Sequence, residues 1–208
     1  MKHLFAFLVL GVALSMCNLA SKLKPGGSGD ANKSAPSASS DGSTVERPAP
    51  TAAQIAAIAG GKTVNWDQQG MSWAVPADWK EQTNETKMLV WSSSGSGAAN
   101  LIVNISPMDE SFPTEISIKA FYDGAKTRAK NGEVDELKWL EIDGLKGVQF
   151  RESNPEQPDG HRRLQWLAYR KYAGQVQMIN VMLSSYGKDF ARHQDAMYGV
   201  LYSTKVTH

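Results

Sequence analysis

Apolar and polar positions divide the chain into three parts. Residues 4–16 form a continuous apolar run that follows Lys2. Residues 18–60 contain no aromatic side chain and consist mainly of Ala, Ser, Gly and Pro. All six Trp and all six Tyr lie in residues 61–208, where apolar positions recur at strand and helix periods. The pattern predicts a signal peptide over residues 1–16, a flexible tether over residues 17–60 and one folded domain over residues 61–208.

Within residues 61–208, short strand-like segments alternate with two helical ones. Residues 64–66, 71–75, 87–91, 100–105, 136–142, 147–151, 162–172 and 175–183 are predicted strands, most of them joined by turn-forming Gly, Asp or Pro. Ile118, Tyr122, Ala125 and Ala129 recur at spacings of 4, 3 and 4, which predicts a helix over the Thr114–Lys130 region. Phe190, Met197 and Leu201 mark a second helix, with Asp189 as its N-cap.

One predicted strand has apolar residues on both faces. Over residues 175–183, Val176, Met178 and Met182 alternate with Ile179, Val181 and Leu183. A strand of this kind needs a cover on each side, and the two helices can supply one each. We therefore expect an α+β fold, an α/β/α sandwich around a mainly antiparallel sheet, with Trp166 and Met178 in its core.

The apolar run ends at Cys17, the only cysteine of the chain. Thirteen apolar residues are too few to span a bilayer core of about 30 Å as a helix, but they suit a signal peptide. Residues 14–17 (Leu-Ser-Met-Cys) resemble the bacterial lipobox, although Met16 stands where that pattern prefers Gly, Ala or Ser. The resemblance implies a diacylglyceryl group on Cys17 and attachment to an envelope membrane. The alternative is ordinary cleavage, for example after Ser15, which gives a soluble secreted or periplasmic protein.

The Ala, Ser, Gly and Pro content of the tether cannot bury enough surface to offset the entropy of ordering it. Residues 51–59 are the exception, because their Ala content favours a helix that Thr51 can cap. Nine residues make a marginal isolated helix. We expect it to form only if Ile55 and Ile58 dock on the domain.

Charge excludes one class of function. Residues 61–208 carry 17 Lys and Arg against 18 Asp and Glu, mixed along the chain. Nucleic-acid-binding proteins usually show a basic stripe. We therefore expect no nucleic-acid partner.

The folded part resembles the PsbP-like family, named after an extrinsic subunit of photosystem II, whose fold a Ran-pathway nuclear-transport factor shares. The resemblance rests on residues 70–79 (GMSWAVPADW), 99–103 (ANLIV), 142–147 (IDGLKG) and 202–205 (YSTK). These motifs are strand ends and turns, so they imply a fold and transfer no catalytic or binding residue.

Short motifs that imitate catalytic sites fit structural roles better. Residues 61–63 (Gly-Lys-Thr) lack the earlier glycine of a phosphate-binding loop, so we expect a helix stop followed by a strand. Ser185 and Lys188 match S-x-x-K, but the companion motifs are absent and their context is a turn into a helix. We therefore expect no catalytic residue and no cofactor.

The sequence also gives only weak candidates for metal ligands and for an aromatic binding platform. His161 is expected in a solvated loop or at an anion site, His193 on a helix face, and neither has metal-ligand spacing. Asp109, Glu110 and Glu115 do not fit an EF-hand loop, so no metal site is expected. The four tryptophans closest in sequence are expected to pack mainly in the core, with an aromatic platform for a sugar or peptide as the alternative: Trp66, Trp73, Trp79 and Trp91.

The sequence therefore favours a non-enzymatic accessory or binding module, held at the bacterial cell envelope through Cys17, with a protein partner. The alternative is an anchored or secreted hydrolase with an unrecognised site, which predicts clustered titratable groups of perturbed pKa in a pocket.

Overall fold

A seven-stranded antiparallel sheet lies at the centre of the computed structural model, which describes residues 44–207. Its strand order is β3-β4-β5-β9-β8-β7-β6, and a smaller antiparallel sheet has the order β1-β2-β10. The elements in chain order are α1 (Ala52–Ile58), β1 (Lys62–Trp66), η1 (Asp67–Gln69), β2 (Met71–Val75), β3 (Lys80–Asn84), β4 (Met88–Ser92), β5 (Asn100–Met108), α2 (Thr114–Lys130), β6 (Val134–Ile142), β7 (Leu145–Glu152), β8 (His161–Tyr172), β9 (Gln175–Tyr186), α3 (Gly187–Tyr202) and β10 (Lys205–Val206).

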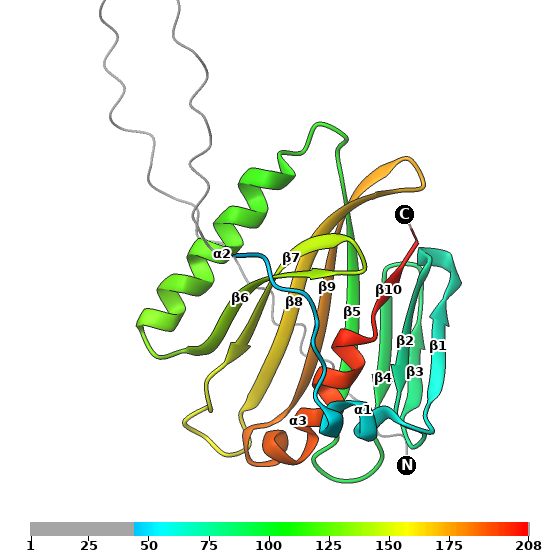
Figure 1. The fold of residues 1–208 in the computed structure, drawn as a ribbon, viewed down its shortest axis with the longest axis vertical. Coiled ribbons are helices and arrows are strands. Elements are labelled where there is room, and N and C mark those ends of the chain that lie inside the picture. The colour runs from blue at the N-terminus through cyan, green and yellow to red at the C-terminus, as the bar shows by residue number, and fades with distance from the viewer. Residues whose placement is uncertain (1–43, 208) are drawn as a thin grey trace, which may run out of the picture. The chain divides into compact units, whose positions relative to one another are not determined.

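The two long helices lie on opposite faces of the large sheet (Figure 1). Helix α2 packs on β6, β7 and β8, whereas α3 packs on β8 and β9 and on β2 of the small sheet. The fold class expected from the sequence, an α+β sandwich around a mainly antiparallel sheet, is confirmed. The small sheet was not expected; it adds to the cover on the α3 side.

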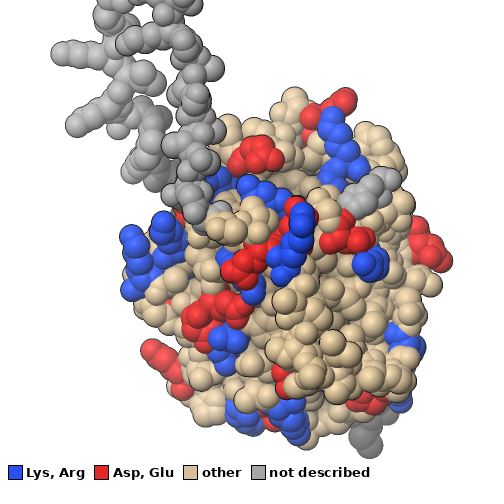
Figure 2. Space-filling model, viewed as in Figure 1, with Lys and Arg blue, Asp and Glu red and all other residues tan. Residues whose placement is uncertain are grey.

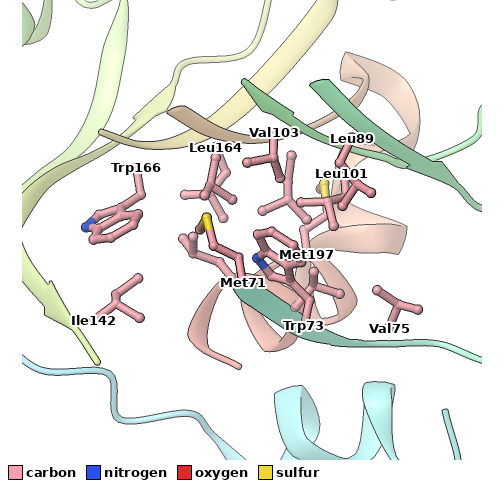
Figure 3. Packing of buried hydrophobic residues seen from close by; sticks show 14 of the residues in the cluster. Met71, Trp73, Val75, Leu89, Leu101, Val103, Ile142, Leu164, Trp166 and Met197 are labelled. Atoms are coloured by element: carbon pink, nitrogen blue, oxygen red, sulfur yellow. The ribbon is translucent and has the colours of Figure 1, made fainter. Parts of the chain in front are cut away.

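The main core lies between the large sheet, the small sheet and α3. Figure 3 shows residues from all three layers pointing into one space: Leu89, Leu101, Val103, Leu164 and Trp166 from the large sheet, Met71, Trp73 and Val75 from β2, and Met197 from α3. A second cluster joins α2 to β6, β7 and β8 through Ile118, Ala125, Val148 and Phe150. Trp166 is fully buried as expected, but Met178 is only half-buried, at the border of the second cluster.

Two helix boundaries show how the sequence acts locally. Helix α2 runs over Thr114–Lys130, the region that the 4-3-4 spacing of its apolar stripe predicted. Helix α3 begins at Gly187 with Tyr186 as its N-cap, earlier than the expected start at Asp189. Strand β9 passes directly into α3 here, so Asp189 lies in the first helical turn.

Residues 44–60, which were expected to belong to the tether, contact the domain in the structure. The backbone of Glu46 exchanges hydrogen bonds with β6, donating to the carbonyl of Trp139 at 2.9 Å and accepting from Glu141 N–H at 2.9 Å. Helix α1 is closed by a capping box between Thr51 and Gln54, and it packs on α3. The expected signal peptide, Cys17 and most of the expected tether lie outside the described residues.

Candidate docking surface

Helix α2 covers only the β6–β8 half of its face of the large sheet. Its buried residues Ile118 and Ala125 contact the cluster that contains Val148, Phe150 and Leu167. In the central rows of β4, β5 and β9 the side chains of this face are half-buried, whereas those of the opposite face are fully buried: Leu89, Leu101, Val103, Ile179, Val181 and Leu183. This half of the face is therefore partly accessible to solvent, because α2 packs on the other half.

The open half-face consists of six side chains in two rows across β4, β5 and β9. Val90 lies opposite Ile102, which lies opposite Met182. In the next row Met88 lies opposite Asn104, which lies opposite Asn180. The open half-face is therefore Met88, Val90, Ile102, Asn104, Asn180 and Met182, and all six are half-buried. None of them is ionisable, so the surface is apolar with two carboxamides.

The space-filling view gives the charge distribution of one side of the molecule. Figure 2 shows Lys and Arg interspersed with Asp and Glu on that side, without a continuous basic stripe. A mixed surface of this kind agrees with the near-balance of charges in the sequence. It gives no support to a nucleic-acid partner, which usually requires a basic stripe.

The flank of α2 that faces the open half-face adds an exposed aromatic ring. The Ser117 hydroxyl lies 2.8 Å from the Tyr169 hydroxyl of β8, which fixes the direction of this flank. Phe121 follows four residues later and so lies on the same side of α2, with 38% of its surface exposed. Gly124 is on this side too, and a Cβ at Gly124 would meet nothing within 4 Å. The surface of α2 is therefore open at Gly124.

One polar atom of the surface lacks a partner. The Asn180 Oδ1 atom is buried and has no hydrogen-bond partner among the described residues. A buried carbonyl without a donor is unfavourable by about 1–3 kcal/mol. This part of the surface is therefore not fully satisfied within the domain itself.

Titratable side chains cluster elsewhere, between β6, β7 and α3. The Tyr198 hydroxyl donates to Glu136, and Arg151 donates to Tyr198 at 3.2 Å. Lys138 contacts Glu136 at 3.2 Å and donates to the Tyr202 hydroxyl at 3.3 Å. Burial, together with the hydrogen bond to Glu136, raises the pKa of Tyr198 well above its usual range. Burial alone would lower the pKa of Lys138, but Tyr202 and Glu136 raise it above its ordinary value.

The hydrolase alternative predicts titratable groups of perturbed pKa in a pocket, and this cluster has the perturbed pKa values but lines neither surface hollow. Its members satisfy one another, and none is a Ser, Cys or His. Two surface hollows of about 240 and 200 Å³ lie elsewhere, one beside Gly70 and Lys205 and the other beside Phe112 and Tyr169. The perturbed pKa values therefore come from a closed ion and tyrosine network that ties α3 to the sheet.

The S-x-x-K pair does not form a nucleophile and its base. Ser185 is fully buried at the end of β9, and its hydroxyl donates to the Tyr186 carbonyl at 3.2 Å. The Lys188 ammonium instead pairs with Asp159. Residues 61–63 are a helix stop and the start of β1, as expected.

The remaining sequence candidates lie apart from the open half-face. His161 is exposed, with its ring 4.9 Å from the Tyr186 ring and tilted by 41° to it, and the His193 ring contacts the Gly97 carbonyl at 3.0 Å. Asp109, Glu110 and Glu115 are exposed, and residues 44–207 contain no group of three side chains placed to hold a metal ion.

The four tryptophans pack in or against the core. Trp66, Trp73 and Trp79 are almost fully buried, and Trp91 packs half-buried against the main core, so the four rings do not form an exposed aromatic platform. Cys17 lies outside the described residues. Within the described part of the chain, no helix is long and apolar enough to cross a bilayer.

Known proteins resemble this chain in fold and not in sequence. Neither a protein-family model nor a curated protein sequence matches the chain. LpqN, described as involved in cell envelope biogenesis of Mycobacterium tuberculosis, is similar with a TM-score of 0.51 and 11% identity, over 72% of this chain and 86% of that chain.

Two further solved structures are similar at lower scores. The cyanobacterial PsbP (CyanoP) of Synechocystis sp. PCC 6803 has a TM-score of 0.45 and 14% identity, over 70% of this chain and 92% of that chain. A Bacteroides thetaiotaomicron protein has a TM-score of 0.47 and 12% identity over 71% of this chain, which spans 49% of that longer chain. At such identities a likeness concerns the fold alone.

Proposed function

We propose that this protein is a non-catalytic accessory module of the bacterial cell envelope, tethered to a membrane through Cys17, and that its open half-face docks an uncharged segment of a protein partner. The observation that carries the proposal is the uncovered half of a core sheet face. Exposed contiguous apolar surface on a soluble domain commonly marks an interaction site. Met88 and Met182 suit such a role, since methionine side chains adapt to different partners.

The chemistry of the surface favours a polypeptide over a lipid bilayer. Asn104 and Asn180 sit among the apolar side chains, and their carboxamides need donors and acceptors that a hydrocarbon interior lacks. Protein segments that lie on anionic bilayers usually carry Lys and Arg around their apolar face, and the six side chains of the open half-face include none. An uncharged segment with its own backbone hydrogen-bonding groups matches this surface.

The point where the tether meets the domain leaves the surface free. Glu46 is held on β6, which is one edge of the large sheet, by backbone bonds and by an ion pair with Lys138 at 3.4 Å. The open half-face lies on β4, β5 and β9, toward the other edge. A partner can therefore bind the open half-face without displacing the contact between Glu46 and β6.

The docking test uses the full chain with a photo-crosslinking residue at Ile102, and a matched one at exposed Thr63 on β1 as control. We expect a single adduct only from Ile102. The partner identified by mass spectrometry, once purified, should bind Met182→Lys about tenfold more weakly, which is about 1.4 kcal/mol, and Thr63→Lys unchanged. Equal binding by the two lysine variants rejects the surface. Binding of the Cys17→Ser chain to protein-free vesicles, lost in Met182→Lys, assigns the surface to the membrane instead.

The tethering test is separate. Two or three acyl chains hold a bacterial lipoprotein firmly, whereas one binds marginally. We expect intact-mass measurement of the mature protein to show an acylated Cys17 N-terminus, and Cys17→Ser to be unprocessed or released from the membrane fraction. A mature N-terminus at another residue without acyl mass contradicts this part and leaves the docking surface standing.

A further inference from the structure

Arg170 on β8 is a buried arginine whose hydrogen-bond partners within residues 44–207 are all neutral. Only 6% of its surface is exposed. Its Nε donates to Gln177 Oε1 at 3.0 Å, and its Nη2 donates to the Gln69 carbonyl at 2.6 Å. The guanidinium carbon lies 4.1 Å from the centre of the Tyr172 ring, which covers it. Arg170 is on the opposite side of β8 from the open half-face, so it is independent of the docking surface.

The lack of a carboxylate partner sets Arg170 apart from the other arginines of the described residues. Residues 44–207 contain seven, and six of them pair with a carboxylate: Arg47, Arg128, Arg151, Arg162, Arg163 and Arg192. Arg170 alone among these has no carboxylate partner, although it is the most buried. Burial lowers its pKa below the ordinary value, which reflects the cost of a charge without a counter-charge. Buried charges in proteins are otherwise paired or bound to ligands.

The hydrogen bonds around Arg170 leave one nitrogen free. Arginine has five N–H donors, and the Nη1 atom is buried without any acceptor in the described part of the chain. The Gln69 carboxamide is itself fixed, because its Nε2 donates to the Thr86 carbonyl at 2.6 Å. Gln69 and Gln177 therefore hold the guanidinium in one orientation while Nη1 keeps its donors.

Tyr172 is the aromatic side chain that lies over the guanidinium. It is the last residue of β8, half-buried, and the following turn has positive φ at Ala173 and Gly174. Its hydroxyl rests against Gly70, where a Cβ would come within 2.9 Å of it.

We propose that Arg170 is a binding site for an oxyanion, a carboxylate or a phosphate, whose oxygen accepts from Nη1 once the Tyr172 ring turns aside. Gln69 and Gln177 act as the positioning residues. The anion supplies the negative charge that Arg170 lacks among the described residues. Charge-assisted hydrogen bonds of this kind are about twice as strong as neutral ones.

The test titrates the full chain with acetate or inorganic phosphate at constant ionic strength, with chloride as reference. The Arg170 Nε–H signal in nitrogen-15 NMR and the melting temperature are followed. We expect saturable changes with a Kd on the order of 1–10 mM for at least one anion. The comparison of acetate with phosphate identifies the chemistry. Arg170→Met should lose both responses, whereas Lys171→Met, which removes the exposed neighbouring cation, should keep them.

A second variant guards against a misfolded Arg170→Met chain. Tyr172→Ala keeps Arg170 and removes its cover, so the anion should bind severalfold more tightly. The proposal is overturned if neither anion shifts the Arg170 signal in the wild-type chain, if Lys171→Met abolishes the response, or if Tyr172→Ala leaves the affinity unchanged.

Discussion

The indole of Trp166 lies against the backbone of Gly147 on the neighbouring strand β7. A Cβ built at Gly147 would stand 2.5 Å from Trp166 Nε1, closer than real contacts allow. The same Nε1 donates to the Leu140 carbonyl of β6 at 3.1 Å. One ring thus spans three strands, and it fits there because residue 147 has no side chain.

Trp166→Ala should lower the free energy of unfolding by about 3–5 kcal/mol, the usual range for a buried aromatic ring whose removal leaves a cavity. The ring is fully buried in the main core, and its loss also removes the hydrogen bond from Nε1 to the Leu140 carbonyl. Urea unfolding followed by fluorescence of the remaining tryptophans measures this. A loss under about 1 kcal/mol would show that the core closes around the gap.

Gly147→Ala should cost about 1–3 kcal/mol, because the new methyl group must displace a packed ring or the Leu167 backbone. Gly124→Ala is the matched control. Its Cβ meets nothing within 4 Å on the surface of α2, so it should stabilise the domain by about 0.5–1 kcal/mol through helix propensity. Both values come from the same urea curves. Equal effects of the two changes would contradict the ring-on-glycine packing.

Periodic elements could be predicted from the sequence, and elements without an apolar period could not. Helix α2 has a four-residue apolar stripe and was predicted at its observed bounds. Strand β3 was missed because its sequence, Lys-Glu-Gln-Thr-Asn, is polar on both faces, as an exposed edge strand can be. Strand β10 was missed because two residues carry no period, so the small sheet was not foreseen.

The docking surface and the Arg170 site both depend on contacts between residues far apart in the sequence, which a local sequence pattern does not reveal. Residues 175–183 alternate apolar side chains on both faces whether or not each face is covered, so only the position of α2 shows that Met182 is half-buried. Gln69 and Arg170 meet across 101 residues of sequence. No spacing rule joins them, and Arg170 looked like part of an ordinary strand.

The pH dependence of stability should show a loss on the alkaline side. Burial raises the pKa of Tyr198 above its ordinary value, and the pKa of Lys138 is also raised in the folded state. Groups of this kind contribute fully below their unfolded pKa, and the contribution is lost as pH rises through the folded value. The free energy of unfolding should therefore fall as pH climbs above about 10.

Tyr198→Phe tests the source of that loss. It removes the hydrogen bond to Glu136, which should lower stability at about pH 8 by about 1 kcal/mol, and it should also flatten the decline above about pH 10. Tyr186→Phe is the control, because Tyr186 is 37% exposed and lies outside the network. Urea titrations from about pH 8 to about pH 11 compare the three chains. An unchanged slope in Tyr198→Phe would assign the alkaline loss to other groups.

Ile58→Ala should destabilise the domain by about 2–3 kcal/mol, whereas Ile55→Ala should change it by less than about 0.5 kcal/mol. Both residues lie in α1, but Ile58 packs against the main core and 54% of Ile55 is exposed. The reason is the close approach of α1 to α3 at Gly199, where a Cβ would lie 2.6 Å from the Gln54 carbonyl and 3.0 Å from Ile58 Cγ2. Gly199→Ala should therefore reproduce most of the Ile58→Ala loss by pushing α1 away.

A chain that starts at Gly61 should still unfold cooperatively, but with a lower midpoint than the full chain. If Ile55→Ala and Ile58→Ala prove equally harmless, α1 does not dock in solution, and the folded domain starts at residue 61.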